Sequence, residues 1–328
     1  MSKTIYEGPF KEHIKNHVEL KQALGYKYDT EAVHLKRFDR FTRQKYPHGA
    51  ALTKEIVLDW CGRTTYEAQA NQCSRASIIR QFGKYLDNIG IEAYIIPKGY
   101  YPGQEQYMPY IYTDDELIRF FTQTDKCQYN SQCPYRHLIM PLLFRMIYMC
   151  GLRVSEARLL KADEVDLENG ILSINNSKKD NSRLVPMSAS LIERCRHYSE
   201  IVHPYPVPEA YYFPAVGGKP MTIVNVYKNF RRFLWSARIS HGGRGYGPRI
   251  CDFRHLYAIC CLKKWVEQKK DLMVYLPVLK TYMGHYSFKD TAYYLRLTAD
   301  VFPDITLKLE TRYPKIIPEL EGGGNETY

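Results

Sequence analysis

A stretch without periodicity divides the sequence and constrains the fold more than any other feature. Residues 94–110 read YIIPKGYYPGQEQYMPY and are rich in proline, glycine and tyrosine. This composition favours a linker, because proline and glycine interrupt helices and strands. A chain of 328 residues is also long enough for about two domains. We therefore expect one domain at residues 1–93, a linker at 94–110 and a second domain at 111–328.

The first part of the chain carries apolar residues at helical spacing. Gly25 lies within LKQALGYKYD at the position of a helix-ending glycine, and Thr53 opens a further helical segment, TKEIVLDWC. A longer segment, SRASIIRQFGKYLDNIG, places its apolar residues on one face before Gly90. About four amphipathic helices are expected here, forming a small all-α module.

The second part mixes helices with a short β-structure. Thr113 and Glu116 form a capping-box pattern, and the apolar helix PYRHLIMPLLFRMIYMCG follows, with an expected kink at Pro141. The runs ILSIN and RLVPM flank the polar turn NSKKDNS, which predicts a β-hairpin. Further helices are expected from residues 188, 222 and 252. The predicted fold class is mainly α, with a small hairpin-containing β-sheet in the second domain.

Composition narrows the kind of protein. The chain has no apolar run of about 18 residues and no signal-peptide core at its start, so a soluble, cytosolic protein is expected. Its nine cysteines show no zinc-finger spacing, and we expect reduced thiols and no metal. The net charge is +11, and residues 219–270 hold twelve Lys or Arg against two acidic residues, with aromatic residues between them. This pattern favours a nucleic-acid partner over a merely solvated basic face.

Chemistry on DNA takes either metal ions or protein side chains. A metal-dependent nuclease needs clustered carboxylates, and no convincing cluster is found in the sequence. Without a metal, a tyrosine can attack the phosphate, although a phenol with a pKa of about 10 is a weak nucleophile at neutral pH. Arginine and histidine must then stabilise the transition state, and an acid must protonate the leaving 5′ oxygen.

Four segments carry these residue types in order, and together they resemble the conserved boxes of the tyrosine recombinases, which include the phage integrases and the Xer resolvases. The segments are YMCGLRVSEARLL, SKKDNSRLVPMS, ICDFRHLYAI and YMGHYSFKDTAYYL. Each short motif is weakly specific, and each residue alone could have an ordinary structural role. All four in order, across residues 151–294, form a strong signal. The helical first part resembles the family's core-binding domain only in outline.

The resemblance implies a role for each matched residue. Arg153 and Arg254 would hold the scissile phosphate together with His285, and Glu156 and His255 would support them from behind. The nucleophile would be Tyr294, nine residues after His285, with its neighbour Tyr293 as the alternative. The lysine that acts as general acid would be Lys178, with Lys179 as its close competitor.

The second box departs from the family pattern at Cys251, where a histidine is usual. A thiol is a poor substitute for an imidazole as a hydrogen-bond donor. Either Cys251 is tolerated with slower chemistry, or Arg249 or His241 from the preceding glycine-rich loop takes over the role.

The resemblance further implies a two-domain clamp around duplex DNA and a metal- and ATP-independent strand transferase without cofactor. It would form a 3′-phosphotyrosyl intermediate and work as a homotetramer, with a C-terminal helix such as FPDITLKLE docking on a neighbour. A mobile-element recombinase acting on bacterial cytoplasmic DNA is favoured. An Xer-like dimer resolvase, a catalytically weakened regulator and a type IB topoisomerase remain alternatives. The expected DNA contacts are Lys179, Arg183, Arg231, Arg232, Arg244 and Arg249.

Overall fold

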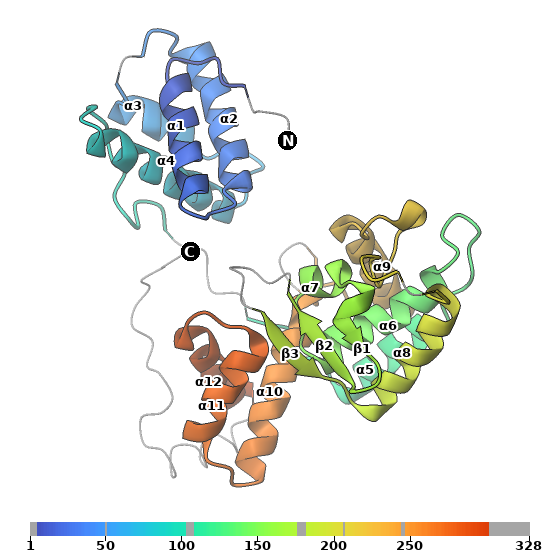
Figure 1. Cartoon of the computed structure of the whole chain (residues 1–328). Helices are drawn as coiled ribbons and strands as arrows, with labels where there is room; N and C mark the ends of the chain where they lie inside the picture. The colour runs from blue at the N-terminus through green and yellow to red at the C-terminus, as the bar shows by residue number, and fades with distance from the viewer. Residues whose placement is uncertain are drawn as a thin grey trace. The chain divides into compact units, whose positions relative to one another are not determined.

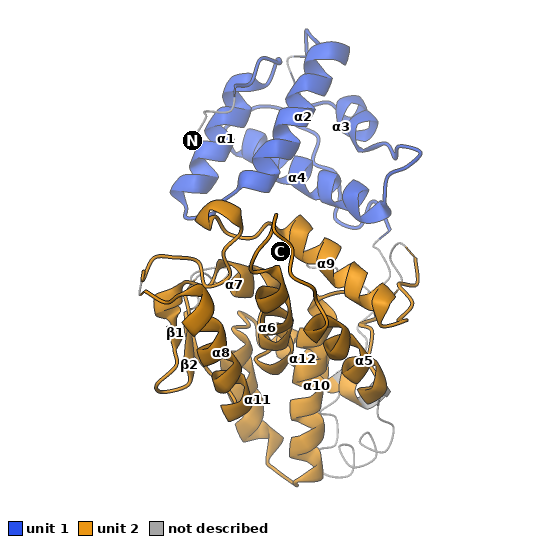
Figure 2. Ribbon diagram, turned by 90° about the vertical axis from the view of Figure 1, so that its right-hand side faces the viewer, with its two compact units in different colours: residues 1–107, 320–328 blue, residues 108–319 orange. Residues whose placement is uncertain are grey.

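The computed structural model describes residues 5–49, 51–102, 108–175, 182–205, 207–243 and 247–301. The chain divides into two compact units, and the change from the first to the second falls between residues 107 and 108 (Figure 2). This position lies inside the aperiodic stretch at residues 94–110. None of the described helices is both long enough and apolar enough to cross a membrane.

The first unit consists of helices packed around an aromatic core. Phe38 lies between Phe10 and Phe82, with ring centroids 6.0 and 6.3 Å away. Gly25 has a φ of 86° directly after the C-cap of the first helix, and the Thr53 hydroxyl caps the third by accepting from the backbone N–H of Ile56. The predicted helices are thus found; they are α1 (Lys11–Ala23), α2 (Asp29–Lys45), α3 (Lys54–Cys61) and α4 (Gln69–Asn88).

The second unit joins eight described α-helices to a three-stranded antiparallel sheet, so the predicted fold class is confirmed (Figure 1). The strands are β1 (Val165–Asp166), β2 (Ile171–Ile174) and β3 (Arg183–Pro186), and short 3₁₀ turns lie at η1 (Ala162–Glu164) and η2 (Val216–Gly218). The helices are α5 (Asp114–Asp125), α6 (Arg136–Met149), α7 (Val154–Leu159), α8 (Ala189–Val202), α9 (Ile223–Ser236), α10 (Cys251–Glu267), α11 (Leu272–Met283) and α12 (Phe288–Val301).

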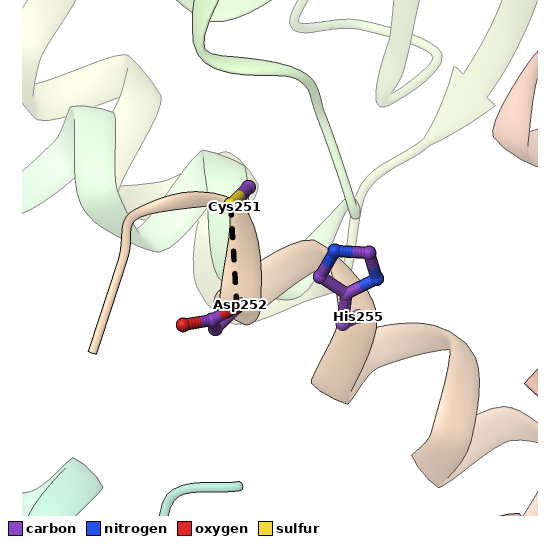
Figure 3. Close-up of side chains that lie close together, drawn as sticks. All are labelled: Cys251, Asp252 and His255. Carbon is purple, nitrogen blue, oxygen red and sulfur yellow. Dashed lines mark hydrogen bonds between the residues drawn. The ribbon is translucent and has the colours of Figure 1, made fainter. Parts of the chain in front are cut away.

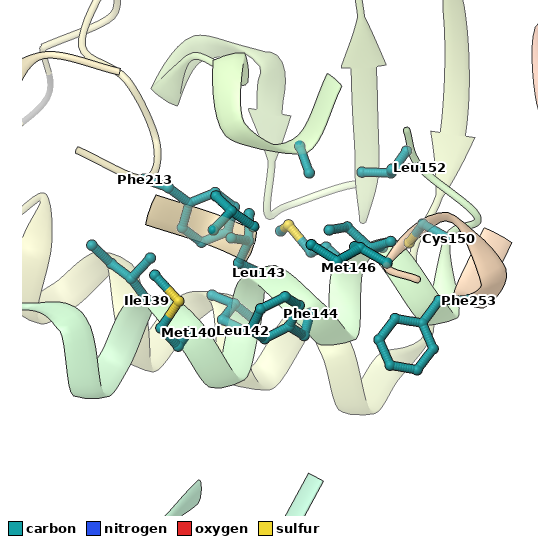
Figure 4. Packing of buried hydrophobic residues seen from close by; sticks show 14 of the residues in the cluster. Ile139, Met140, Leu142, Leu143, Phe144, Met146, Cys150, Leu152, Phe213 and Phe253 are labelled. Carbon is teal, nitrogen blue, oxygen red and sulfur yellow. The ribbon is translucent and has the colours of Figure 1, made fainter. Parts of the chain in front are cut away.

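Helix α6 runs through the middle of the second unit's core. Its apolar residues are buried almost all round, as expected for a helix that other elements surround (Figure 4). Phe144 packs against Phe120 and Phe230, with ring centroids 5.6 and 5.9 Å away, and Phe120 lies 5.2 Å from Phe253 of α10. Pro141 lies inside this one continuous helix. The core therefore fixes α10 against α6.

The predicted hairpin is present and sets the direction of its side chains. Ile174 pairs with Arg183, and Leu172 pairs with Val185. Successive residues of a strand point to opposite faces, and the burial of β3 alternates, with Arg183 and Val185 buried and Leu184 and Pro186 exposed. The strand thus directs the arginine at its start into the protein interior, toward α7 and α11.

Candidate active site

The buried carboxylate of Glu156 is the centre of a cluster of arginines. Glu156 lies on α7, and its side chain is 1% exposed. Its two oxygens accept hydrogen bonds from Arg153 and Arg183, and Arg254 lies 3.9 Å away. These arginines come from three segments far apart in the sequence. A carboxylate with two oxygens and several lone pairs can serve such a set of donors at once.

The charges around Glu156 keep it ionised. Burial alone raises the pKa of a carboxyl group, but the hydrogen bonds and charge of Arg183, the backbone N–H of Arg153 and the charge of Arg254 outweigh it. The pKa of Glu156 is lowered to about 2. Because one negative charge faces three permanently positive guanidinium groups, the cluster keeps a net positive charge that suits an anionic ligand.

Arg153 is the arginine of this cluster that reaches toward solvent. It stands directly before α7, and its backbone N–H donates to Glu156 Oε2 at 2.9 Å. Its Nη1 donates to Glu156 Oε1 at 2.6 Å, and its Nη2 donates to the Gly284 carbonyl at 2.9 Å. The side chain is still 29% exposed. It is thus held at two points and retains an open edge.

Arg254 is buried and held by the carbonyls at two helix ends. Its Nη1 donates to the Gly151 carbonyl at 2.6 Å, and its Nη2 donates to the carbonyl of Met283. The last carbonyls of a helix have no partner within the helix, so they are free to accept such bonds. Burial first, and then the charge of Arg153, lower the pKa of Arg254 to about 10, so it remains protonated at neutral pH.

The two glycines beside Arg153 and Arg254 cannot be replaced without strain. Gly151 ends α6 with a φ of +59°, and Gly284 ends α11 with a φ of +61°. A Cβ atom would lie 2.7 Å from the Tyr257 ring at Gly151, and 2.9 Å from Arg183 Nη1 at Gly284. Only glycine takes this left-handed conformation at no steric cost. Both glycines therefore position carbonyl oxygens that hold the site.

Arg183, expected among the DNA contacts, is instead part of the interior. Its guanidinium makes two hydrogen bonds to Glu156, at 3.0 and 2.8 Å, and its Nε donates to the Tyr282 carbonyl at 2.6 Å. The side chain is almost fully buried. The pleat of β3 causes this difference, because residue 183 falls on the buried face. Its role here is to hold Glu156 and the end of α11.

Tyr294 of α12 lies beside His285, which precedes this helix. The spacing of the last box predicts that these two residues are close. The two rings are stacked, with centroids 5.7 Å apart and an interplanar angle of 12°. His285 Nδ1 lies 2.9 Å from the hydroxyl of Thr291, which fixes the imidazole from behind. The alternative nucleophile, Tyr293, is less deeply buried and lies on the edge of the His255 ring. The stacking thus distinguishes the two neighbouring tyrosines.

Burial keeps both Tyr294 and His285 uncharged in this structure. Tyr294 is 4% exposed, and this burial raises its pKa to about 12, although the charges of Arg254 and Arg153 act in the opposite direction. Burial also lowers the pKa of His285 to about 3, and the nearby arginines add to this effect. The arginines therefore lie close enough to Tyr294 to favour its phenolate form.

The first turn of α10 brings three chemically different groups together (Figure 3). The Cys251 thiol lies 4.0 Å from Oδ1 of Asp252, whose Oδ2 accepts from the backbone N–H of Arg249 at 2.7 Å. The ring of His255 follows one turn later and lies 5.6 Å from that of Tyr294. Burial, followed by the charge of Arg254, lowers the pKa of His255 to about 4. Cys251 thus lies beside the candidate site.

The remaining expected DNA contacts fall on different parts of the chain. Arg231 and Arg232 are exposed on α9, whereas Arg249 and His241 are half-buried on either side of the loop before α10. Lys178, Lys179 and Arg244 lie outside the described residues, and so does the segment FPDITLKLE. Their expected roles stay predictions.

Two supports of the site were not singled out from the sequence. Thr291 is fully buried and contacts His285, and the only signal for it is the T-x-x-Y spacing before Tyr294. The carbonyl of Gly284 accepts from Arg153, a bond between residues 131 positions apart. No local pattern predicts such a bond, because it depends on how α11 and α7 pack.

Solved structures with a similar fold include recombinases and integrases. XerH recombinase, in its post-cleavage complex with palindromic difH substrate, gives a TM-score of 0.63 at 19% identity, covering 95% of this chain and 90% of that one. A lambda integrase dimer bound to a COC′ core site gives 0.62 at 14% identity, covering 86% and 94%. The fold is therefore that of the tyrosine recombinases.

The family follows from sequence comparison. The model of the phage integrase family matches residues 113–300, more than half of the chain, and the protein belongs to this family. The putative integrase/recombinase y4rB of Sinorhizobium fredii is 28% identical over 311 residues, which cover 93% of this chain and 98% of that protein. A tyrosine recombinase of Pseudothermotoga lettingae is 25% identical over 157 residues, covering 48% and 49%. The resemblance to tyrosine recombinases is confirmed.

Proposed function

We propose that this protein is a site-specific DNA recombinase that cuts and rejoins DNA through a covalent bond to Tyr294. The observation that carries the proposal is that Arg153 and Arg254, which lie at the buried Glu156 carboxylate, are also close to Tyr294, which stacks on His285. These residues come from α7, α10 and the segment from α11 to α12. A functional site is best recognised from several roles that meet in one place.

The chemistry is a transesterification. The phenol oxygen of Tyr294 attacks the phosphorus and passes its proton to solvent water, a 3′-phosphotyrosyl bond forms, and the bond to the 5′ oxygen breaks. Arg153, with its open edge, and Arg254 would neutralise the phosphate oxygens as charge builds up on them. Lys178 would give a proton to the leaving 5′ oxygen. A 5′ hydroxyl from a partner strand then reverses the step and restores the free tyrosine.

Tyr294 must become more accessible for this reaction, because a DNA phosphate cannot reach a hydroxyl that is as buried as this one. A phosphate entering beside Arg153 would bring negative charge next to the arginines and compete with Glu156 for them. A shift of α12 would then bring Tyr294 to the phosphate. The proposal thus includes a rearrangement of α12 on DNA binding.

The partner would be duplex DNA containing two recombination sites. Arg231 and Arg232 offer exposed positive charge on α9 that suits a phosphate backbone. We further propose that the protein assembles as a homotetramer on DNA in the bacterial cytoplasm and serves a mobile element. The relative that matches nearly the whole chain is named as a putative integrase/recombinase, and the word integrase is the support for this choice.

Covalent trapping tests the proposal directly. The probe is duplex DNA from the region that flanks the protein's own gene, tiled in short fragments, each with a nick that lets the freed strand diffuse away. The wild-type protein is expected to give a protein–DNA adduct that survives denaturation. Tyr294→Phe should give none while still retarding the same DNA in a native gel, because the substitution removes only the hydroxyl.

Tyr293→Phe is the matched control for this experiment. It removes a hydroxyl from the neighbouring ring and should leave the adduct within a few-fold of the wild-type amount. A full adduct with Tyr294→Phe, or its loss only with Tyr293→Phe, would overturn the assignment of the nucleophile. Wild-type protein that binds the DNA tightly and never forms an adduct would overturn the proposed function.

A further inference from the structure

The start of α10 carries a set of side chains that the proposed reaction does not use. Cys251, Asp252 and His255 each offer one atom of metal-ligand type, and these atoms lie within 4.8 Å of one another (Figure 3). Cys251 and His255 are four residues apart on one helix. This spacing places two side chains on the same face, one turn apart.

One of these residues has a buried ring nitrogen without a hydrogen-bond partner. Nδ1 of His255 is buried and has no hydrogen-bond partner in the structure. A buried polar atom without a partner costs free energy, and such atoms in native proteins call for an explanation. When Nδ1 carries the imidazole proton, the other ring nitrogen, Nε2, offers its electron pair to a cation, and Nε2 is the nitrogen on the side of Cys251 and Asp252 (Figure 3).

We propose that Cys251, Asp252 and His255 form a binding site for one divalent cation of the zinc class. A thiolate, an imidazole and a carboxylate together match the preference of zinc for sulfur, nitrogen and oxygen ligands, and disfavour magnesium and calcium. Three protein ligands leave the fourth tetrahedral position to water or to another ligand.

The geometry requires only side-chain adjustment. Ligand atoms around one tetrahedral zinc lie roughly 3.3–3.5 Å apart, given metal–ligand bonds of about 2.0–2.3 Å. Cys251 Sγ and Asp252 Oδ1 are already 4.0 Å apart. Rotation of the Cys251 and His255 side chains about their χ angles can close the remaining gap, since both are only partly buried. Asp252 is held in place by the backbone N–H of Arg249.

The site lies next to the candidate nucleophile. The His255 ring is 5.6 Å from that of Tyr294, so a cation bound to His255 would lie near the place where the phosphate has to enter. It would restrain the first turn of α10, which also carries Arg254. We expect bound zinc to slow strand cleavage, and this consequence rests on the proposed function, whereas metal binding itself does not.

Cobalt(II) titration of the full-length protein tests the binding site. Cobalt bound by a thiolate gives a charge-transfer band in the near ultraviolet, and four-coordinate cobalt gives intense visible bands. We expect one equivalent to bind to wild-type protein with both signals, and excess zinc to remove them. Cys251→Ser should abolish the charge-transfer band. His255→Gln should weaken binding at least about 100-fold, since even the loss of an outer partner of a ligand costs 10–100-fold.

Two further variants make the result specific. Cys260→Ser removes an exposed thiol from the same helix and should bind cobalt as the wild type does. Cys251→His exchanges the sulfur ligand for nitrogen, so the visible bands should persist while the charge-transfer band disappears. Circular dichroism confirms folding in each case. Wild-type protein without the band, Cys251→Ser with a full band, or His255→Gln with wild-type affinity would each overturn the metal site.

The cleavage assay separates the metal site from the proposed function. Each protein is compared with its own metal-free rate on the trapped DNA substrate. Zinc should reduce the wild-type rate at least about tenfold and change that of Cys251→Ser less than about twofold, as expected when one ligand carries most of the affinity. A wild-type protein that binds cobalt but never cleaves DNA would contradict the proposed function without contradicting the metal site. Equal inhibition of both proteins would overturn the effect assigned to this site.

Discussion

The core around α6 and the arginine cluster around Glu156 lie in the same unit and are stabilised in opposite ways. The core joins aromatic and aliphatic side chains such as Phe144 and Phe253, whose contacts have little directional preference (Figure 4). In the cluster, guanidinium nitrogens donate to particular oxygens, such as those of Glu156 or Gly284. Close packing of side-chain volume stabilises the core, whereas hydrogen-bond direction and charge stabilise the cluster.

This difference predicts how each region responds to change. A core residue that is made smaller leaves a cavity, which lowers stability but leaves the remaining contacts in place. Removing one member of the cluster leaves buried polar groups without partners, and it also moves the residues proposed to hold the phosphate. Mutations in the core should therefore mainly change the free energy of unfolding, whereas mutations in the cluster should mainly change the rate of the reaction.

Truncation in the core should give the largest change in stability. Phe144→Ala is expected to lower the free energy of unfolding by about 3–5 kcal/mol, because a fully buried ring is lost and a cavity remains. The cleavage rate per folded molecule should stay within a few-fold of wild type. Denaturant unfolding followed by circular dichroism measures the first quantity, and covalent trapping measures the second.

An exposed residue of the same unit provides the control for that comparison. Ile118→Ala removes a side chain that is 67% exposed on α5 and should change stability by no more than about 0.5 kcal/mol. If Phe144→Ala changed the free energy of unfolding as little as Ile118→Ala does, the Phe144 ring would not stabilise the core as we expect. If it stopped cleavage by folded protein, the separation between core and cluster would be wrong.

A change in the cluster should affect the rate more than the stability. Arg254→Lys is expected to reduce the cleavage rate by about 10²–10³-fold, as for the loss of one donor to a developing negative charge. Lysine keeps the charge but cannot reach the Gly151 and Met283 carbonyls together, since it lacks the planar fork of arginine. Single-turnover kinetics at saturating protein give the rate.

The matching control is Arg231→Lys on the exposed face of α9, where the same exchange should leave the rate within about threefold because a surface charge is retained. Near-normal cleavage by Arg254→Lys would remove Arg254 from the phosphate-binding site. Slow cleavage by Arg231→Lys would show instead that the rate is equally sensitive to any arginine in this unit.

Acid should reveal the Glu156 cluster by a smaller effect on stability. The pKa of Glu156 is lowered to about 2 in the folded protein, from an ordinary value of 4.5. The folded protein therefore holds this proton less tightly than the unfolded chain. The resulting stability is fully present above about pH 4.5 and is lost as the pH falls toward 2, with a total on the order of 2–3 kcal/mol.

Glu156→Gln removes the titrating group and keeps the shape of the side chain. The difference in the free energy of unfolding between wild type and this variant should shrink as the pH is lowered from 7 to 3. A difference that stays constant over this range would mean that the Glu156 carboxylate does not hold the arginines as its contacts indicate.

Features that depend on local pattern were predictable from the sequence. Thr113 and Glu116 form the capping box that their spacing predicts, and the hairpin pairs Ile174 with Arg183 as the two short β runs suggest. The four boxes also indicated which residues meet, because the resemblance already contains long-range information. Arg153, Arg254, His285 and Tyr294 are indeed brought together in the second unit.

Features that depend on packing were not predictable in this way. A basic residue on a hairpin looks like a surface charge, and only the pleat of β3 shows that Arg183 faces Glu156. Cys251 and His255 are four residues apart in the sequence, and this helical spacing is not a zinc-finger pattern. The approach of the Cys251, Asp252 and His255 ligand atoms to within 4.8 Å of one another is a property of the folded protein alone.

The glycines that end α6 and α11 have a consequence for how this protein can change over time. A descendant of this chain can exchange one side chain for another at position 251 and retain its backbone. At positions 151 and 284, any mutation away from glycine strains the backbone next to a main-chain oxygen that accepts from an arginine. Two residues with no side chain are therefore expected to tolerate substitution poorly, because their backbone conformation holds the arginines in place.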